Sequence, residues 1–569
     1  MASSPNVNKA NKYARDVVAG RVLAGELVRM ACKRHLSDLD TKDFPYKFEK
    51  AKAERACKFI QLLPHTKGKW ANKQEKIVLE PWQCFIVASI FGWVRKDNGL
   101  RRYREAYLEV ARKNGKSIIS AAIGLYMLCA DDEFGAEVFS GATTEKQAWE
   151  VFRPARLMAA RTPELCQMFG IDVNAKTLSI PEDGSRFEPL IGNPGDGSSP
   201  SCALVDEYHE HANSDLYDTM ITGMGSRDQP LTLIITTAGS NLGGPCYEKR
   251  GVAQKVLQGA LDDDRLFTMI YTIDPGDDWT QPEILRKANP NLGVSVSEDF
   301  LLAQVKRAIQ SPTQQNTVKT KHFNCWVGAK SAWLNMEQWN KCADTSLKIE
   351  DFKGEPCVVG LDLATRIDVA AAVQVFYREE DDGLTHYYAF PKLWLPEHAL
   401  ESSRNAQRYM GWAGMGLIDL IDGAEIDLNG IQDWLVGDPN DDETGLASQY
   451  YIAEVAYDPW QASQLAQTAS AQGARVVEFR NIVSNMSPAM KELEGAIQSG
   501  RFHFDGNPAL TWMASNVVAK LDAKDNIYPV KEQPENKIDG IVALIMAIGR
   551  AYYAQESRSA YESESLMVV

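Results

Sequence analysis

The feature that most constrains the fold is an apolar segment that leads through Gly-Lys-Ser into an apolar helix. Residues 105–110 have the composition of a buried strand, and residues 117–129 that of a helix. A strand, a Gly-Lys-Ser turn and a helix form a phosphate-binding loop, although Val110 stands where the usual signature has its first glycine. The sequence therefore predicts either such a loop in an α/β fold or an ordinary loop-to-helix junction.

The residues of this loop carry the groups that a nucleotide phosphate requires. Backbone N–H groups around Asn114 and Gly115 open the helix and can donate to phosphate oxygens. Lys116 can reach the β- and γ-phosphates, and the Ser117 hydroxyl can ligate Mg²⁺. Arg112 is expected to face the phosphates and stabilise charge in the transition state, or else to pair with a nearby carboxylate.

The surrounding sequence alternates strands and helices. Expected strands at 136–140, 202–205 and 231–236 alternate with helical patterns such as 145–161. Such βα repetition favours a doubly wound, mostly parallel sheet. Residues 7–63 before it read as amphipathic helices.

Two further strands end in polar residues that suit an ATPase. The strand at 201–205 ends in Asp206, which can hold Mg²⁺, and Glu207, which can polarise the attacking water. The strand at 233–235 leads into Thr236, Thr237, Ser240 and Asn241, groups that can sense a γ-phosphate; a plain Gly-Ser turn is the alternative. The Asp-Glu pair, placed after a Gly-Lys-Ser helix, makes ATP hydrolysis the favoured interpretation.

Two other motifs are less specific. Trp82 could lie beside an adenine ring and the Gln83 amide could contact it, whereas a Pro-Trp helix start is the simpler interpretation. The sequence His209-Glu210-His211 has metal-ligating side chains, but a polar loop is favoured for it.

A second alternation begins after a polar, tryptophan-containing stretch. We expect a helical region at 1–75, an ATPase domain at 76–335, a linker at 336–355 and a second domain at 356–569. The second domain opens with three consecutive strands near 358–364, 368–377 and 386–390, joined by tight turns that include Thr365-Arg366.

Three aspartates mark this second domain. Asp362 lies in its first strand, Asp458 ends a later strand, and Asp539 lies in the first turn of the last helix. Each alone could be a turn or cap residue, but together they suit a site with two divalent metals in a ribonuclease-H-like fold. Lys531 and Asp525 could contact the scissile phosphate or a further metal, although a solvated loop is favoured for both.

Composition excludes several classes of protein. Ten cysteines without a Cys-x-x-Cys pair argue against a zinc or disulfide framework, and no apolar run is long enough to span a bilayer. An intracellular, membrane-free protein is therefore expected. The net charge is −15, but residues 7–76 hold 17 Lys/Arg against 8 Asp/Glu, so a local basic surface could still bind a polyanion.

These motifs, in this order, resemble the large terminase subunit of tailed double-stranded DNA phages, and most closely the HK97-like type. The resemblance rests in the first half on Pro81-Trp82-Gln83 and the segments 111–117, 204–207 and 236–240. In the second half it rests on the segments 360–363, 457–460 and 537–540.

The resemblance implies a DNA-packaging motor. Such a protein cuts concatemeric viral double-stranded DNA, docks with the small terminase subunit on the portal of a procapsid in the host cytoplasm, and pumps the genome inside without remaining in the mature virion. It implies ATP with Mg²⁺ in the motor site and two divalent metals, Mg²⁺ or Mn²⁺, on Asp362, Asp458 and Asp539 of the nuclease site. It also implies a ring on the portal, formed from subunits that are monomers in solution.

The resemblance leaves two assignments open. Family rings use an arginine from a neighbouring subunit, and Arg153, Arg156 and Arg161 all lie in the expected region. The middle nuclease carboxylate is placed on Asp458, although Glu454 lies on the same strand.

The alternatives are a DNA helicase or translocase whose second domain only binds, and a procapsid assembly factor in which both sites are inactive. A junction resolvase or transposase shares the nuclease geometry, but neither explains an N-terminal motor.

Overall fold

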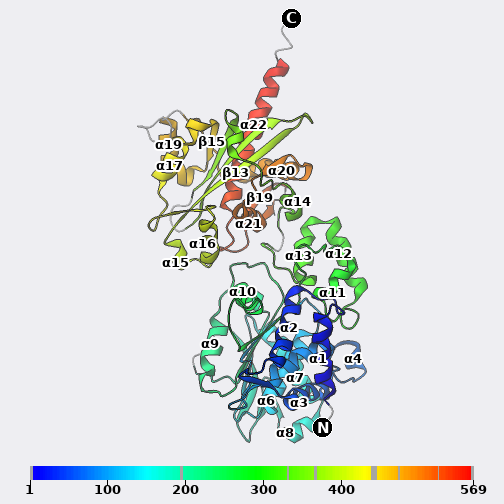
Figure 1. Cartoon of the computed structure of the whole chain (residues 1–569). Helices are drawn as coiled ribbons and strands as arrows, with labels where there is room; N and C mark the ends of the chain where they lie inside the picture. The colour runs from blue at the N-terminus through cyan, green and yellow to red at the C-terminus, as the bar shows by residue number, and fades with distance from the viewer. Residues whose placement is uncertain are drawn as a thin grey trace. The chain divides into compact units, whose positions relative to one another are not determined.

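The chain folds into two compact units in this computed structural model, residues 1–327 and 328–569. The structure describes residues 4–191, 197–329, 332–363, 368–437, 445–471, 474–522 and 524–564 (Figure 1). The expected turn at Thr365-Arg366 lies outside the described residues.

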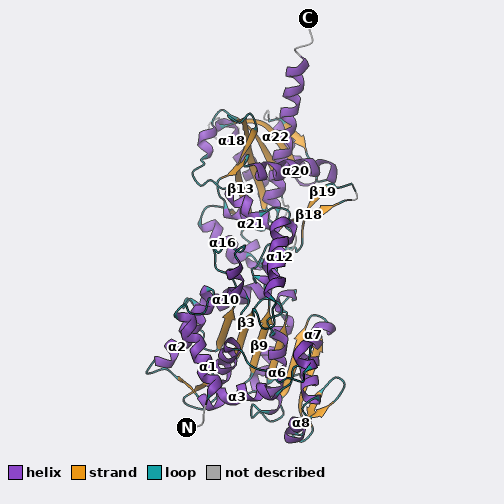
Figure 2. Cartoon of the chain, turned by 90° about the vertical axis from the view of Figure 1, so that its right-hand side faces the viewer, coloured by secondary structure: helices purple, strands orange, loops and turns teal. Residues whose placement is uncertain are grey.

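The first unit is built on an eight-stranded sheet with the order β10-β3-β9-β8-β4-β7-β6-β5. All pairs from β10 to β7 are parallel, and the last two pairs are antiparallel. Figure 2 shows β3 and β9 side by side within it. The strands are β3 (Glu105–Glu109), β4 (Glu137–Ala142), β5 (Asp172–Val173), β6 (Leu178–Ile180), β7 (Ser185–Ile191), β8 (Cys202–Asp206), β9 (Leu231–Thr236) and β10 (Leu266–Ile270).

Both faces of this sheet are covered, which explains why its central strands are almost wholly apolar. In β9, Leu233 and Ile235 belong to a core with the N-terminal helices, whereas Ile234 belongs to a second core with α10 (Pro245–Leu257). The alternation follows from the two-residue period of a strand. The first core includes α1 (Pro5–Val18), α2 (Glu26–Asp40), α3 (Lys50–Leu62), α5 (Pro81–Gly92), α6 (Lys116–Cys129), α7 (Glu145–Ala160) and α8 (Pro163–Phe169). The helices of residues 1–75 are thus part of the first unit's core.

The last part of the first unit is a small helical layer with its own core. It contains α12 (Glu298–Gln310) and α13 (Pro312–His322), and its buried residues include Trp279, Leu301 and Phe323. After α13 the chain runs through Asn324 to Val327 and enters the second unit.

The second unit is a mixed seven-stranded sheet with the order β14-β13-β12-β11-β15-β16, to which β17 (Phe502–Phe504) adds beside β13. β11 (Pro356–Asp362), β12 (Ala370–Glu379) and β13 (Thr385–Pro396) are antiparallel neighbours, and β15 (Tyr451–Tyr457) runs parallel to β11. β14 (Asp419–Ile421) and β16 (Val476–Glu478) complete the sheet. The expected succession of three strands, a later strand and a last helix is therefore present.

The last helix packs directly on the first strand of this sheet. α22 (Asp539–Glu564) approaches β11 so closely that a Cβ on Gly360 would collide with the main-chain oxygen of Ala543. A glycine at this point lets the helix backbone lie on the strand. The other helices of this unit include α16 (Ala406–Gly414), α17 (Leu428–Val436), α19 (Pro459–Ala471), α20 (Val483–Ser499) and α21 (Pro508–Asn516), and a hairpin is formed by β18 (Val517–Leu521) and β19 (Ile527–Lys531).

Residues 336–355, expected as a linker, are ordered within the second unit. They include α14 (Met336–Lys341) and the 3₁₀ turn Ile349–Phe352. Trp339 is fully buried, with its ring 4.9 Å from that of Phe504 and 5.4 Å from that of Phe502. The expectation of a linker rests on a polar, tryptophan-containing stretch, and such a pattern does not show that Trp339 packs in a core.

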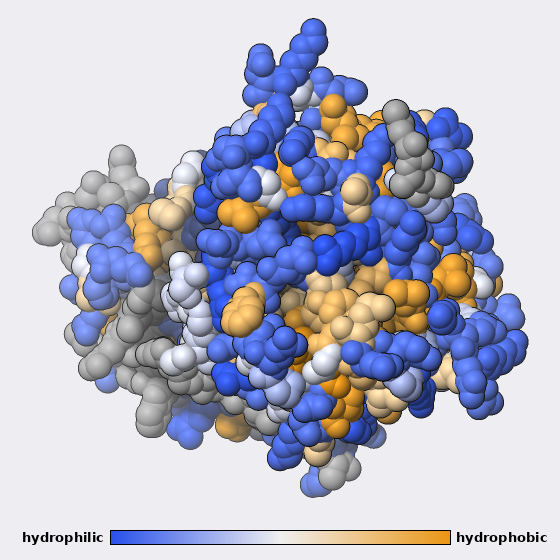
Figure 3. Space-filling model, turned by 90° about the horizontal axis from the view of Figure 1, so that it is seen from below, coloured by the Kyte–Doolittle hydropathy of each residue, from blue (hydrophilic) through white to orange (hydrophobic). Residues whose placement is uncertain are grey.

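The surface view in Figure 3 shows apolar patches among mostly hydrophilic residues. Among the described helices, none combines the length and apolar character needed to cross a bilayer.

Candidate functional site

The predicted phosphate loop joins β3 to α6 and has the backbone of a tight turn. Lys113 and Gly115 have positive φ values of 70° and 84°, and Gly115 caps the helix that begins at Lys116. Only glycine adopts this conformation without steric cost, so its place before the lysine is explained. The loop thus directs the N-terminus of a 14-residue helix, with its unpaired N–H groups, to the carboxyl edge of the sheet.

Asparagines from a distant segment brace this loop. Asn114 is fully buried and donates to Asn289 Oδ1 at 3.0 Å, and its own Oδ1 accepts from the main-chain N–H of Asn291 at 3.0 Å. Asn291 Oδ1 in turn accepts from the indole N–H of Trp82 at 2.7 Å. Asn289 and Asn291 therefore connect Trp82 to the loop, which places the expected adenine contact beside the expected phosphate contact. The sequence patterns did not indicate either asparagine.

Gln83 serves as a helix cap in this structure. Its Oε1 accepts from the N–H of Glu80 at 2.9 Å, and its Nε2 lies 3.6 Å from the position of a Cβ on Gly115. Arg112 is exposed, and its main-chain N–H donates to the Lys321 oxygen at 3.1 Å. Gln83 therefore lies beside the loop and Arg112 within it, and these are the places predicted for contacts with ATP.

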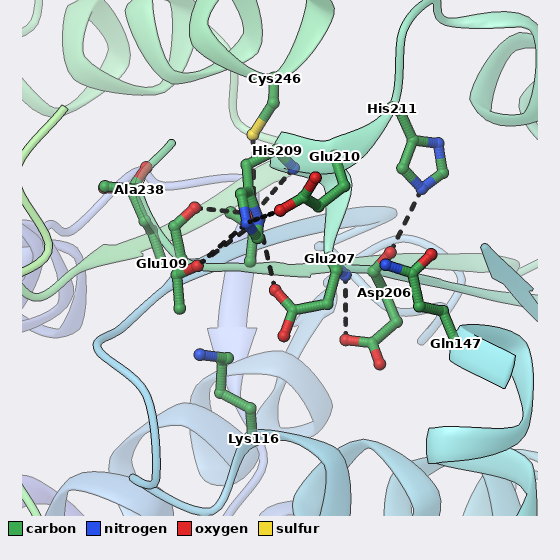
Figure 4. A network of polar contacts seen from close by, with 12 residues as sticks. Glu109, Lys116, Gln147, Asp206, Glu207, His209, Glu210, His211, Ala238 and Cys246 are labelled. Atoms are coloured by element: carbon green, nitrogen blue, oxygen red, sulfur yellow. Dashed lines mark hydrogen bonds and ion pairs between the residues drawn. The ribbon is translucent and has the colours of Figure 1, made fainter. Parts of the chain in front are cut away.

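The sheet order brings the acidic pair to the same edge. β9 lies between β3 and β8, so the ends of three neighbouring parallel strands carry the loop, Thr236 and Asp206. Figure 4 shows Lys116 below the carboxylate of Glu207 and His209 above it. Lys116 Nζ donates to the Val110 oxygen at 2.7 Å.

The charges of this edge influence one another. Burial lowers the pKa of Lys116 to about 8, against the opposing influence of Glu207 and Asp206. Burial, reinforced by the charge of Glu207, raises the pKa of Asp206 to about 7. A bound cation favours the ionised form of a carboxyl whose pKa burial has raised. Asp206 beside Lys116 therefore fits an Mg²⁺–nucleotide.

Glu207 itself is held in an unusual conformation. It has φ 47° and ψ 48°, a left-handed backbone that costs a residue with a side chain about 1 kcal/mol or more. Its Oε2 is buried, forms no hydrogen bond within the described part of the chain, and lies 3.3 Å from His209 Nδ1. Such strain at the predicted catalytic carboxylate is consistent with a functional position.

His209 links this carboxylate to the predicted coupling segment. Its main-chain N–H donates to Thr236 Oγ1 at 3.0 Å, its Nδ1 lies 3.1 Å from the same oxygen, and Thr237 Oγ1 lies 3.4 Å from its Nε2. The metal interpretation of His209-Glu210-His211 gains no support, since the described residues include no His, Cys, Asp or Glu cluster arranged to hold a metal. The role of His209 as a contact between two motifs was not apparent from the sequence.

The other coupling residues lie in the same loop. Thr236 and Thr237 are buried, and Ser240 is nearly so. Asn241 Oδ1 accepts from the Gly243 N–H at 3.3 Å, which is a local turn contact.

A buried glutamate that the sequence did not single out lies at the base of this loop. Glu109, the last residue of β3, accepts from Tyr107 Oη at 2.6 Å, Trp326 Nε1 at 3.2 Å and Asn324 Nδ2 at 3.3 Å, and pairs with Arg250. Asn324 Oδ1 also accepts from the Ala238 N–H at 2.7 Å. The strand before the phosphate loop is thereby tied to the end of the first unit.

In the second unit the three predicted aspartates come together. Leu361 pairs with Tyr457 in parallel register, so Asp362 and Asp458 follow at the same edge of the sheet, and α22 brings Asp539 against it. Burial first, and then the charges of Asp539 and Asp458, raise the pKa of Asp362 well above its usual range. Burial and the charge of Asp368 raise the pKa of Asp539 to about 6.

The donors of this cluster fit a hard divalent cation. Asp539 Oδ2 is buried and accepts no hydrogen bond within the described residues, and mutual repulsion of the carboxylates is relieved when a cation lies among them. Asp368, which the sequence did not indicate, adds a fourth carboxylate and pairs with Lys537 at 2.8 Å. Among the described residues, no three of these carboxylates lie close enough together to hold one metal ion without a shift of the side chains.

Three other residues considered for the nuclease site differ in burial and charge pairing. Glu454 is buried between Arg475 at 3.2 Å and Arg550 at 2.7 Å, so its charge is already paired. Lys531 is exposed, and its charge opposes the rise in the pKa values of Asp362 and Asp539. Asp525 lies exposed in the turn between β18 and β19.

A separate surface cavity of about 1180 Å³ contains none of the predicted site residues. It is lined by residues such as Phe59, Leu62 and Met168, and by Ala130 at the end of α6 opposite to the phosphate loop. A 14-residue helix is about 21 Å long, so this cavity is remote from the predicted nucleotide site.

Comparison with known proteins identifies the family. Residues 81–255 match the model of the terminase large subunit ATPase domain, and residues 260–555 match that of the terminase large subunit endonuclease domain. The chain belongs to the terminase large subunit family. It is therefore a phage DNA-packaging motor with ATPase and endonuclease activities that acts on DNA with other packaging components.

Several known proteins are similar to this chain. The chain is 47% identical over 367 residues to Protein YmfN of Escherichia coli K12, covering 63% of this chain and 78% of that protein. It is 28% identical to the terminase large subunit of Enterobacteria phage HK97, with 78% of this chain and 86% of that one covered. The crystal structure of the HK97 large terminase matches with 26% identity and a TM-score of 0.43, covering 88% and 99% of the two chains.

The expected fold class, an ATPase domain followed by a nuclease domain, is confirmed by these family matches. The residue assignments within the two sites remain predictions, which the geometry now allows us to propose in detail.

Proposed function

We propose that Lys116, Ser117, Asp206 and Glu207 carry ATP hydrolysis in this motor. The observation that supports this most is the convergence of the ends of β3, β9 and β8 on one edge, with Lys116 and the acidic pair electrostatically coupled there. Lys116 and the loop N–H groups bind the phosphates, Ser117 and Asp206 hold Mg²⁺, and Glu207 takes a proton from the attacking water. Bound Mg²⁺ supplies charge neutralisation at the transferred phosphate.

Other residues complete the proposed motor site. Trp82 and Gln83 contact the adenine side, Asn114 and Gly115 shape the loop, and Arg112 contacts the phosphates. Thr236, Thr237, Ser240 and Asn241 respond to the γ-phosphate. Of the three candidate arginines, Arg153 is exposed on α7, Arg156 is half-buried, and Arg161 donates to the oxygens of His65 and Thr66. Arg153 is therefore our choice for action on a neighbouring subunit.

For the nuclease site we propose that Asp362, Asp458 and Asp539 hold two divalent cations. When bound, the cations activate water and stabilise the leaving oxygen. Asp458 is favoured over Glu454 as the middle ligand because both carboxylate oxygens of Glu454 are already paired with arginines. We also propose that Lys531, whose charge acts on the same carboxylates, contacts the DNA phosphate, although the sequence alone favoured a solvated loop for it.

We further propose the setting in which these activities operate. The chain assembles as a ring on the portal of a procapsid in the host cytoplasm, with the small terminase subunit, cuts concatemeric DNA and drives it inside. It leaves the portal when packaging ends.

Two variants test the site assignments on the full chain. Lys116→Ala is expected to lower ATP hydrolysis by at least about a hundredfold, because a group that stabilises transition-state charge is lost. Lys146→Ala, an exposed lysine on α7, is the matched control. Unchanged hydrolysis in Lys116→Ala would contradict the motor site and favour an inactive assembly factor.

Asp362→Ala tests the nuclease site by conversion of supercoiled plasmid to linear DNA in Mn²⁺. Cleavage is expected to disappear, whereas the exposed Asp525→Asn variant cleaves as the wild type does. Wild-type cleavage by Asp362→Ala would favour a helicase or translocase whose second domain only binds DNA.

A further inference from the structure

Another surface cavity of the first unit, with a volume of about 440 Å³, lies at the amino edge of its sheet. Two of its lining residues, Glu105 and Thr232, are parallel partners at the beginning of β3 and β9. The phosphate loop follows the other end of β3, which is five residues long at about 3.3 Å for each residue. The cavity is therefore separate from the proposed nucleotide site. Its lining includes six arginines, which are Arg95, Arg101, Arg102, Arg104, Arg227 and Arg265.

Two of these arginines lack a direct countercharge. The other four are paired with carboxylates, in the pairs Arg95–Asp97, Arg101–Asp131, Arg102–Asp38 and Arg227–Glu133. Within the described part of the chain, the side chains of Arg104 and Arg265 form no ion pair. They come from neighbouring segments, because the Arg104 N–H donates to the Arg265 oxygen at 2.9 Å. The cavity thus has two adjacent arginines whose charges have no direct partner.

Arg104 is the more constrained of the two. It is half-buried, and its Nη1 is enclosed without a hydrogen-bond acceptor among the described residues. Burial first, and then the charges of Arg101, Arg265 and Arg95, lower its pKa to about 10. A buried donor without an acceptor is unfavourable, and more so when it is charged. An anion in the cavity would offset both the burial of this guanidinium and its repulsion by the other arginines.

The acidic residues of the same cavity do not supply this compensation. Glu105 already has a lysine partner at 2.7 Å, and Asp263 Oδ1 accepts from a main-chain N–H at 2.9 Å. Asp228 is exposed, and although its charge raises the pKa of Arg104, its influence is smaller than that of any of the three arginines. The electrostatic potential at Arg104 is therefore positive on balance, as an anion site requires.

We propose that this cavity binds a small anion with two or more phosphate groups, at a site distinct from the motor and nuclease sites. A guanidinium can donate two parallel hydrogen bonds to phosphate oxygens, so Arg104 and Arg265 together match an ion with at least two negative charges. The volume lies within the range of small-ligand sites. Arg101 and Arg102, which also line the cavity, are only 3% and 1% exposed, so the ligand has to enter a hollow. The phosphates of duplex DNA are fixed along a rod, and they fit such a hollow less well than those of a free ion.

The test is calorimetric titration of the full chain with inorganic pyrophosphate in EDTA. All proteins carry Lys116→Ala, which removes the lysine expected to bind phosphate in the motor site, and EDTA removes metal that could hold the anion at the nuclease carboxylates. Pyrophosphate is expected to bind this parent protein. Arg104→Gln and Arg265→Gln are each expected to weaken binding by at least about tenfold, because each removes hydrogen bonds from a charged donor. Asp228→Asn is expected to strengthen binding by about two- to fivefold, because it removes an exposed opposing charge.

The matched control is Arg15→Gln, which changes an exposed arginine of α1 that does not line the cavity and is expected to leave pyrophosphate binding as in the parent. Thermal melting without the anion checks folding. Arg104→Gln is expected to melt no lower than the parent, because it relieves repulsion among the arginines. Pyrophosphate is expected to raise the melting temperature of the parent but not that of Arg104→Gln. Arg265 is exposed, so Arg265→Gln tests the site even if Arg104→Gln does not fold.

Two results in the titration would overturn the inference: pyrophosphate that does not bind the parent, or that binds the parent and both arginine variants equally well. A third would come from competition. If a short DNA duplex displaces pyrophosphate, and Arg104→Gln weakens binding of the duplex to the same degree, the cavity contacts the DNA backbone and is not a site for a small anion. The comparison does not depend on the motor-site assignment, because all of the variants share Lys116→Ala.

Discussion

Replacement of Asp539 by asparagine is expected to abolish DNA cleavage and, in the absence of metal, to stabilise the protein. Asparagine has nearly the same shape but no charge, so the change removes one member of a crowded group of carboxylates. Burial and the charge of Asp368 raise the pKa of Asp539 from 3.8 to about 6. The folded state therefore disfavours the ionised form that prevails at neutral pH.

The magnitude follows from this pKa. Below pH 3.8 the group is protonated in both folded and unfolded chains, and wild type and variant are equally stable. As the pH rises through 6, the wild type loses about 3 kcal/mol of unfolding free energy that Asp539→Asn retains, at about 1.4 kcal/mol for each unit of pKa. At pH 4.5 the difference is expected to be only about 1 kcal/mol.

The assay is urea unfolding of the second unit, followed by a probe in that unit, at pH 8 and pH 4.5 in EDTA. Asp525→Asn, which makes the same chemical change in an exposed turn, is expected to unfold as the wild type does at both pH values. Excess Mg²⁺ is expected to stabilise the wild type by about 3 kcal/mol at a hundred times its dissociation constant, and Asp539→Asn much less.

The reasoning is refuted if Asp539→Asn is less stable than the wild type at pH 8, or if their difference does not change with pH. Either result would mean that Asp539 is stabilised by the fold and is not held there for the cation.

Three further predictions concern other parts of the structure. Burial lowers the pKa of Lys116 to about 8, so the KM for ATP is expected to rise by about tenfold per pH unit above pH 8 as the ammonium loses its proton; steady-state kinetics from pH 7 to 10 measure this. Asp131→Ala is expected to cost the first unit about 3–5 kcal/mol, because it leaves the buried Arg101 guanidinium without its bidentate partner at 2.8 and 2.9 Å. Gly360→Ala is expected to destabilise the second unit by at least about 1–3 kcal/mol and to abolish cleavage but not ATP hydrolysis, since the new methyl group meets the Ala543 oxygen.

Each of these has a matched comparison. A KM that is constant across the pH range would contradict the first. Asp97→Ala, which removes an exposed bidentate partner of Arg95, is expected to cost less than about 1 kcal/mol, and an equal cost for Asp131→Ala would contradict the second. Gly414→Ala adds a Cβ in open space, so equal melting of both glycine variants would contradict the third.

The sequence predicts this fold well where the pattern is local. The strand β3, the helix α6 and the strand before Asp206 follow from apolar periods and turn residues near one another in the chain. The order of strands does not follow in this way, because the place of β9 between β3 and β8 depends on packing across the sheet.

The contacts around the site are harder to predict for the same reason. Asn291 supports the phosphate loop from a position 177 residues away from Asn114, and no motif connects them. Asp368 stands at the start of the strand expected at 368–377, and only the pairing of β11 with β12 brings it to the nuclease carboxylates. His209 suggested a metal ligand or a polar loop, whereas its neighbours in space are hydroxyl groups and a carboxylate.

The burial of Trp339 determines where the chain can be divided. A nuclease fragment that begins near residue 345 would leave Phe502 and Phe504 without the indole that covers them, and would lose the pairing of Ala343 with Phe504. Loss of a buried tryptophan typically costs about 3–5 kcal/mol, enough to unfold many small domains. A fragment that begins at Gly328 contains the whole second unit, including this tryptophan, and is the one to express for work on the nuclease alone.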